Sequence, residues 1–194
     1  MKLGIIGLPQ SGKTTLFNAL TRATQPTGIT GKIEVHTAVV DVPDNRVDKL
    51  SAMFLPKKTI YAKVTYADIA GLDGSAGKSG IAGTLLNNLT QMDGFIHVVR
   101  CFEDDNVPHP SGSVDALRNL AAMDSEFLLN DLIAVERRLE KLAEEKKKGA
   151  GRDKAVIDRE IELFNRFHET LSQDKLLRDL ALTHEEEKIS AKNK

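Results

Sequence analysis

The sequence predicts an α/β fold in which a parallel sheet carries an inserted antiparallel helical hairpin, and three observations support this prediction. Short apolar runs alternate with helical patterns through about the first hundred residues, as in parallel strands joined by helices. A glycine-rich loop separates the first apolar run from the first helix. Beyond about residue 115, apolar residues recur at spacings of three and four, the pattern of paired helices.

Composition bounds the class of protein. A chain of 194 residues with 41% hydrophobic residues can form one domain with an appendage, and a formal net charge of −1 gives no general attraction to nucleic acid or membrane. No apolar segment is long enough for a signal peptide or a membrane span, which predicts a cytoplasmic protein. The single cysteine, Cys101, excludes an internal disulfide, and its place at the end of an apolar run predicts burial.

The elements of the first half follow in order from periodicity and turn residues. Strands are predicted over residues 2–6, 37–42, 60–67 and 95–99, where apolar runs or alternation occur. Helices are predicted from residue 15, over residues 45–53 and around residues 85–89. Two loops rich in glycine, threonine or serine, over residues 23–31 and 71–83, separate these elements.

The segment Gly7-Leu8-Pro9-Gln10-Ser11-Gly12-Lys13-Thr14 matches the phosphate-loop pattern G-x-x-x-x-G-K-[ST]. Its place between a strand and a helix favours phosphate binding over a plain glycine turn, because the loop amides and the helix N-terminus together attract anions. Lys13 is expected to reach the β- and γ-phosphates of a nucleoside triphosphate. The residues expected to hold the nucleotide, mainly through the backbone, are Gly7, Pro9, Gln10, Ser11, Gly12, Lys13, Thr14 and Thr15.

A second motif, Asp68-Ile69-Ala70-Gly71, stands at the end of the predicted third strand. A D-x-x-G pattern alone is often a plain turn. Paired with a phosphate loop, it predicts that Asp68 and the Thr14 hydroxyl bind Mg²⁺ and that the Gly71 amide meets the γ-phosphate.

The hairpin is predicted from two apolar seams on either side of a break at Gly149 and Gly151. Each helix is expected to be roughly 30 to 35 Å long at 1.5 Å per residue. The lysine run at residues 146–148 is either a solvated helix end or a contact for ribosomal RNA or another acidic surface. The seams are Leu128, Leu132, Val135, Leu139 and Leu142, then Ile157, Ile161, Phe164, His168 and Leu171.

Three segments together resemble the YchF subfamily of Obg-like P-loop NTPases: residues 7–20, residues 68–72, and the run Val98-Val99-Arg100-Cys101-Phe102-Glu103-Asp104-Asp105-Asn106. The resemblance covers about residues 1–187. It implies a nucleotide-binding domain over residues 1–122, a helical coiled-coil insertion over residues 123–183 and a tail over residues 184–194. It also implies nucleotide hydrolysis coupled to ribosome binding, with ATP usually preferred over GTP.

The resemblance also implies the residue that positions the attacking water. Leu72 stands where Ras-like enzymes have the glutamine that orients this water, and leucine cannot form the hydrogen bond. A histidine shortly after the C-F-E-D-D-N run takes that role in the family, which assigns it here to His109. The alternative is a solvated loop histidine. His97, within an apolar strand, is expected to be structural.

The chain departs from the family pattern in switch I, in the second glycine loop and at its end. Lys32 stands where a threonine would bind Mg²⁺, so that ligand is either absent or supplied by Thr27 or Thr30. The base-reading N-x-x-E motif does not occur, which predicts an incomplete sheet and leaves ATP or GTP open. The expected function is Mg²⁺-dependent nucleoside triphosphate binding with slow hydrolysis by Lys13 and His109. A non-hydrolytic module that acts through its hairpin is the alternative, and a small-molecule kinase is a weaker one.

Overall fold

The computed structural model describes residues 1–27, 35–69, 83–149 and 151–192. These residues form two compact units, one made of residues 1–27, 35–69 and 83–120 and the other of residues 121–149 and 151–192.

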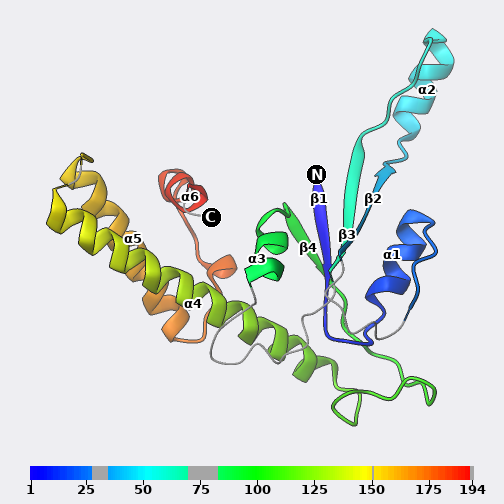
Figure 1. The fold of residues 1–194 in the computed structure, drawn as a ribbon. Helices are drawn as coiled ribbons and strands as arrows, with labels where there is room; N and C mark the ends of the chain where they lie inside the picture. The colour runs from blue at the N-terminus through cyan, green and yellow to red at the C-terminus, as the bar shows by residue number, and fades with distance from the viewer. Residues whose placement is uncertain (28–34, 70–82, 150, 193–194) are drawn as a thin grey trace. The chain divides into compact units, whose positions relative to one another are not determined.

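The first unit contains a four-stranded sheet with the strand order β2-β3-β1-β4 (Figure 1). Its strands are β1 Lys2–Ile6, β2 Val35–Asp41, β3 Lys63–Ile69 and β4 Gly94–His97. The central strand β1 pairs in parallel with both β3 and β4, with Ile5 opposite Asp68 and Ile6 opposite His97. The carboxyl ends of these three strands therefore meet at one edge of the sheet, where ligands bind in open α/β folds.

The prediction of a parallel sheet is confirmed for β1, β3 and β4 and is wrong for β2. This strand pairs antiparallel with β3, from Val35 opposite Ile69 to Asp41 opposite Lys63. The reason is the connection: α2 (Asn45–Phe54) lies at the far end of a β2–β3 hairpin and does not cross the sheet as a βαβ helix would (Figure 1). The third strand also begins at residue 63, three residues later than predicted.

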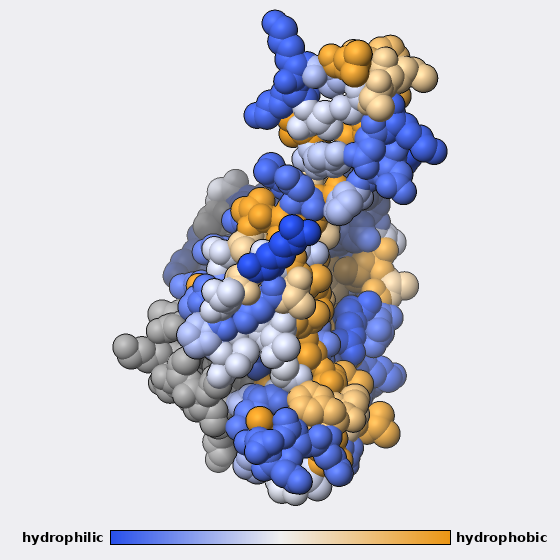
Figure 2. All heavy atoms as spheres, turned by 90° about the vertical axis from the view of Figure 1, so that its right-hand side faces the viewer, coloured by the Kyte–Doolittle hydropathy of each residue, from blue (hydrophilic) through white to orange (hydrophobic). Residues whose placement is uncertain are grey.

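The apolar side of α2 is exposed. Figure 2 shows apolar surface over this helix, and the side chains of Leu50, Met53 and Phe54 are 55%, 73% and 73% exposed. The helical spacing of its apolar residues therefore predicted the helix correctly but not its surroundings.

The core of the first unit lies against the central strand. Helix α1 (Lys13–Thr21) packs on the sheet and buries Phe17, while α3 (Gly83–Thr90) buries Leu85 and Leu89. From the sheet, Ile5 and Ile69 are completely buried. Each such side chain contributes about 1.5–3 kcal/mol. This core holds the start of α1 and the end of β3 in place.

The second unit contains the predicted helical hairpin. Helix α4 (Ala116–Lys148) begins in the first unit and continues into the second, where α5 (Lys154–Ser172) follows it, and then a 3₁₀ turn (Leu177–Asp179) and α6 (His184–Ala191). At 33 residues α4 is about 50 Å long. This exceeds the predicted 30 to 35 Å because the helix already begins at Ala116. The buried core between the helices consists of Val135, Leu142, Ile157, Leu163, Phe164, Phe167 and Leu171.

One position of the predicted seam is wrong. His168 is half-exposed, with Nε2 3.6 Å from a Glu136 carboxylate oxygen, and the neighbouring Phe167 is buried in the core instead. The rings of Phe164 and Phe167 meet edge to face with centroids 5.4 Å apart. Ile189 of α6 also packs against this core, so residues 184–191 belong to the hairpin unit.

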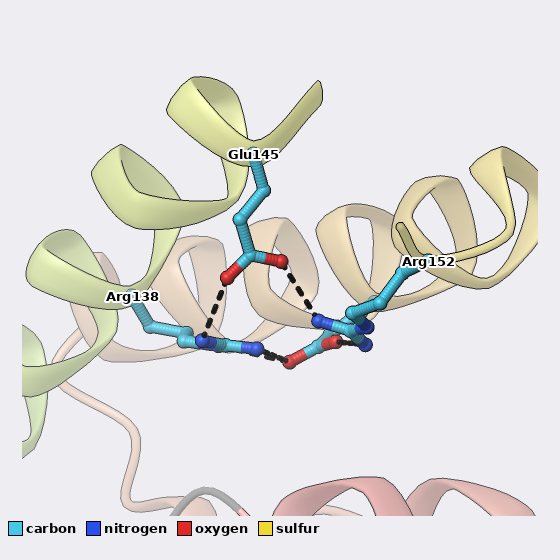
Figure 3. A network of polar contacts seen from close by, with 4 residues as sticks. Arg138, Glu145 and Arg152 are labelled. Carbon is cyan, nitrogen blue, oxygen red and sulfur yellow. Dashed lines mark hydrogen bonds and ion pairs between the residues drawn. The ribbon is translucent and has the colours of Figure 1, made fainter. Parts of the chain in front are cut away.

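A network of four charged side chains joins α4 to the start of α5 (Figure 3). Arg138 of α4 donates to Glu160 Oε1 through Nε at 2.9 Å and Nη2 at 2.5 Å. Arg152 donates to Glu160 Oε2 at 2.6 Å and to Glu145 at 2.9 Å. Burial alone would raise the pKa of Glu160, but the hydrogen bonds from Arg152 and Arg138 outweigh it and hold this pKa below its usual value.

Candidate nucleotide-binding site

The backbone of the phosphate loop (residues 7–14) adopts conformations that require glycine. Gly7 has φ +147° and Gly12 has φ +97°, both in the region that disfavours other residues. A Cβ atom on Gly7 would lie 2.3 Å from the Val98 carbonyl oxygen, so the loop passes directly against the segment that follows β4. Gln10 also has a positive φ, of 60°. The turn is closed by the Ser11 N–H, which donates to Leu8 O at 3.3 Å.

Lys13, the first residue of α1, folds its side chain back over this loop. Its Nζ donates to Leu8 O at 2.8 Å, and the side chain is partly buried. Burial lowers the pKa of Lys13, and the carboxylate of Asp68 partly opposes this effect. Because the Lys13 ammonium group is bound only to a carbonyl oxygen of its own loop in the hydrogen bond described, it can exchange this acceptor for an anionic ligand.

Thr14 and Asp68 meet across the sheet edge. The Thr14 hydroxyl donates to Asp68 Oδ2 at 2.7 Å, although the two residues are 54 positions apart in the chain. Asp68 is 3% exposed, and its buried Oδ1 has no hydrogen-bond partner among the residues that the structure describes. A buried carboxylate oxygen without a partner is costly. This pair therefore fits a magnesium ion, which prefers oxygen ligands and is commonly held by one or two carboxylates together with phosphate oxygens.

The other predicted nucleotide contacts differ in their surroundings. Ser11 is 5% exposed, and its buried Oγ lacks a partner within the described part of the chain. Pro9 carries no N–H and can contribute only its fixed φ. Thr15 and Thr27 are exposed. The predictions for Gly71, Leu72, Thr30 and Lys32 concern residues outside the described ranges.

The segment after β4 is tied down by Arg100, a residue that the sequence reasoning did not single out. Arg100 is 2% exposed and donates to the carbonyl oxygens of Phe102 at 3.0 Å and Val107 at 2.6 Å. Its guanidinium also lies 4.7 Å from the centre of the Phe102 ring. An arginine directly after an apolar strand was the available signal. Cys101 beside it is exposed, contrary to the prediction, because β4 ends at His97 and this residue already lies in the loop.

The structure brings His109 beside the phosphate loop. A cavity of about 10 Å³ is lined by His109 together with Leu8, Pro9 and Ser11 of that loop. The Ser111 N–H donates to His109 Nδ1 at 3.0 Å, and the Asn119 amide lies 3.0 Å from Nε2. Both ring nitrogens are thus engaged, and His109 must release one of them before it can orient a water. The half-buried His97 lines the same cavity.

Comparison with known proteins agrees with this arrangement. A family model described as "50S ribosome-binding GTPase" matches residues 2–149. The chain belongs to this family. It is similar to the protein named "Ribosome-binding ATPase YchF" from Bacillus subtilis (strain 168), with 35% identity over 189 residues that cover 96% of this chain and 50% of the relative. The protein of the same name from Escherichia coli O157:H7 is 37% identical over 192 residues, 95% of this chain and 51% of its own.

A solved structure, described as that of the Schizosaccharomyces pombe YchF GTPase, is similar over the whole chain. Its TM-score is 0.75 at 30% identity, and the match covers 53% of that protein. The predicted resemblance to the YchF subfamily and the predicted P-loop fold with a helical hairpin are therefore confirmed. The chain spans about half the length of the curated relatives it matches. No helix within the described ranges is long and apolar enough to cross a membrane.

Proposed function

We propose that this chain binds a nucleoside triphosphate with Mg²⁺ and hydrolyses it slowly. The observation that carries the proposal is the hydrogen bond between Thr14 and Asp68, directly beside the folded-back side chain of Lys13. A hydroxyl, a buried carboxylate and a lysine that meet at a helix N-terminus form the set of groups that phosphoryl-transfer sites of this class use.

Each residue has a separate role in this proposal. Thr14 and Asp68 would hold Mg²⁺, which neutralises phosphate charge when it is bound. Lys13 exchanges its bond to Leu8 O for the β- and γ-phosphates, and the loop amides surround the phosphate chain. His109 orients the attacking water after one of its ring nitrogens is released. We expect slow turnover, because the glutamine of Ras-like enzymes is replaced by Leu72.

The proposal leaves open whether the nucleotide carries adenine or guanine. The bacterial relatives are named as ATPases and the yeast relative as a GTPase. Calorimetric titration of ATP, GTP and their diphosphates, with and without Mg²⁺, separates these alternatives.

Two pairs of matched variants test the proposed site. Lys13→Ala is compared with Lys63→Ala, which removes an exposed lysine that pairs with Asp41. Asp68→Asn is compared with Asp41→Asn, which removes the other half of the same exposed pair. Lys13→Ala and Asp68→Asn are expected to lower triphosphate affinity or turnover at least 100-fold, while the control variants stay within about 2-fold. Unchanged binding and turnover in both site variants would refute the proposal.

A second candidate function is association with the ribosome through the hairpin. The relatives named as ribosome-binding ATPases match this chain across residues of the hairpin. Deletion of residues 136–162 removes α4 from residue 136 onward and α5 up to residue 162. If the hairpin is the contact, the deletion abolishes cosedimentation with ribosomes and leaves nucleotide affinity unchanged. If cosedimentation survives, the contact lies elsewhere.

A further inference from the structure

The two nitrogens of His109 have partners of different kinds. Nδ1 accepts a hydrogen bond from the Ser111 backbone, so this nitrogen carries its lone pair and no proton. A neutral imidazole then has its proton on Nε2, which faces the Asn119 amide at 3.0 Å. Only the amide oxygen of Asn119 can accept a hydrogen bond from that proton. Rotation of the amide group by a half-turn exchanges its nitrogen and oxygen and places the oxygen against Nε2.

The two partners also differ in how firmly they are held. Asn119 is 4% exposed and lies in the first turn of α4, where its N–H donates to Asp115 O at 3.1 Å. Ser111 is exposed, and its backbone N–H donates to the ring. Water can replace the Ser111 N–H readily, whereas replacement of Asn119 would leave a buried amide without a partner.

We propose that Asn119 is a positioning residue, which holds the ring of His109 through Nε2 and thereby leaves Nδ1 as the nitrogen that meets the attacking water once the Ser111 N–H is displaced. This inference rests on the proposed function and names the orienting partner within it. A base whose second nitrogen is held by a buried side chain has its ring orientation fixed. The charged and titratable groups that share the cavity with His109 are Arg100 and His97.

Asn119→Leu and Asn119→Asp test this role in the full chain. Leucine branches at the same atom but carries two bulkier methyl groups and accepts no hydrogen bond, and we expect single-turnover hydrolysis to fall 10- to 100-fold with nucleotide affinity within about 3-fold. Aspartate accepts from Nε2 and should retain hydrolysis. Because a carboxylate favours the protonated imidazole, the acid side of the pH–rate profile should move to higher pH. Asn87→Leu, in the exposed part of α3, is the matched control and should change neither rate nor profile.

Two further measurements decide whether Asn119 acts through His109. In a His109→Ala background, Asn119→Leu should cause no additional loss of rate, whereas a merely structural role gives an additive loss. NMR of the nucleotide-free protein should show His109 protonated on Nε2, because the Ser111 N–H occupies Nδ1. Ring motion of His109 should increase in Asn119→Leu but not in Asn119→Asp.

A proton on Nδ1 in the wild-type chain, or an Asn119→Asp variant as slow as Asn119→Leu, would overturn the inference. A wild-type chain that hydrolyses no triphosphate would instead refute the proposed function. The NMR measurement needs no nucleotide and decides the tautomer in either case.

Discussion

The candidate nucleotide site and the Glu160 network of the hairpin treat their buried polar groups in opposite ways. At the sheet edge, Ser11 Oγ, Asp68 Oδ1 and one nitrogen of Arg100 are buried without a partner in the described part of the chain. In the hairpin, both carboxylate oxygens of the equally buried Glu160 accept hydrogen bonds from arginines. The comparison teaches that burial alone does not mark a functional site, and neither does a single unpartnered oxygen, since Glu126 Oε2 in α4 is also buried without a partner among the described residues. The candidate site differs because three such atoms, on Ser11, Asp68 and Arg100, occur in and around the phosphate loop.

The cost of the two arrangements differs accordingly. A buried polar atom without a partner destabilises the fold by about 1–3 kcal/mol. The first unit sustains this cost with the apolar core around Ile5, Phe17 and Ile69. Around Glu160 the charges are neutralised within the hairpin itself, so this network needs no ligand.

The largest effect is expected from Gly7→Ala, which tests the phosphate loop of the candidate site. The new methyl group would lie 2.3 Å from Val98 O and 3.0 Å from Ser11 Oγ, at a φ of +147° that alanine rarely adopts. The loop must shift, and we expect nucleotide affinity to fall at least about 100-fold, or ~2.7 kcal/mol.

Gly12→Ala is the matched control for the clash. Gly12 also has a positive φ, but nothing lies within 4 Å of its Cβ position. Its cost is therefore backbone strain alone, of order 1 kcal/mol. Calorimetry on both variants should rank them in this order. Equal losses would show that the contact with Val98 does not limit the loop.

The hairpin half is tested by Glu160→Gln. Glutamine keeps the shape of the side chain but removes the charge that accepts from Arg138 and Arg152, so we expect the free energy of unfolding of the hairpin to fall by about 2 kcal/mol. Glu145→Gln, whose side chain is 30% exposed, should cost less than about 1 kcal/mol. Hydrogen exchange of α5 amides measures both losses, and nucleotide affinity should not change in either variant.

Much of the fold follows from the sequence because periodicity and glycine placement act locally. The first strand, the phosphate loop, α2 and the hairpin core all lie close to where the sequence predicts them. The direction of β2 does not follow from the sequence. An amphipathic helix between two strands has the same sequence pattern whether it crosses the sheet between parallel strands or projects from the end of an antiparallel hairpin. The antiparallel register of β2 with β3 and the exposure of Leu50 and Phe54 distinguish the two.

The site was predictable in part for the same reason. The meeting of Thr14 with Asp68 follows from motifs at adjacent strand ends. The roles of Arg100, Asn119 and Glu160 could not be predicted, because each depends on contacts with backbone atoms or side chains that spacing along the chain does not reveal. A buried charge in an otherwise amphipathic helix, such as Glu160, looks the same in the sequence as a solvated one.

The pH dependence of the hairpin sharpens the comparison further. Hydrogen bonds from two arginines outweigh the effect of burial and hold the pKa of Glu160 below its usual 4.5. This carboxylate therefore stabilises the folded state fully above about pH 4.5, and its contribution is lost as the pH falls through the folded-state pKa. Urea denaturation of the wild-type chain should show a drop in the free energy of unfolding on acidification. In Glu160→Gln this drop should be smaller, and an equal drop in both proteins would assign it to other carboxylates.

The smallest effect is expected at the lysine run. Lys146 pairs with Asp158 at 2.6 Å and Lys148 with Glu144 at 3.0 Å, and these side chains are half-exposed or more. Exposed pairs contribute about 0–1 kcal/mol, so Lys146→Gln and Lys148→Gln should barely change stability. Their effect on ribosome cosedimentation then separates the two interpretations of the run. A loss of cosedimentation that is larger in the double variant and smaller at high salt concentration indicates contact with RNA phosphates. Unchanged cosedimentation means that these lysines only neutralise carboxylates of the hairpin, as Arg138 and Arg152 neutralise Glu160.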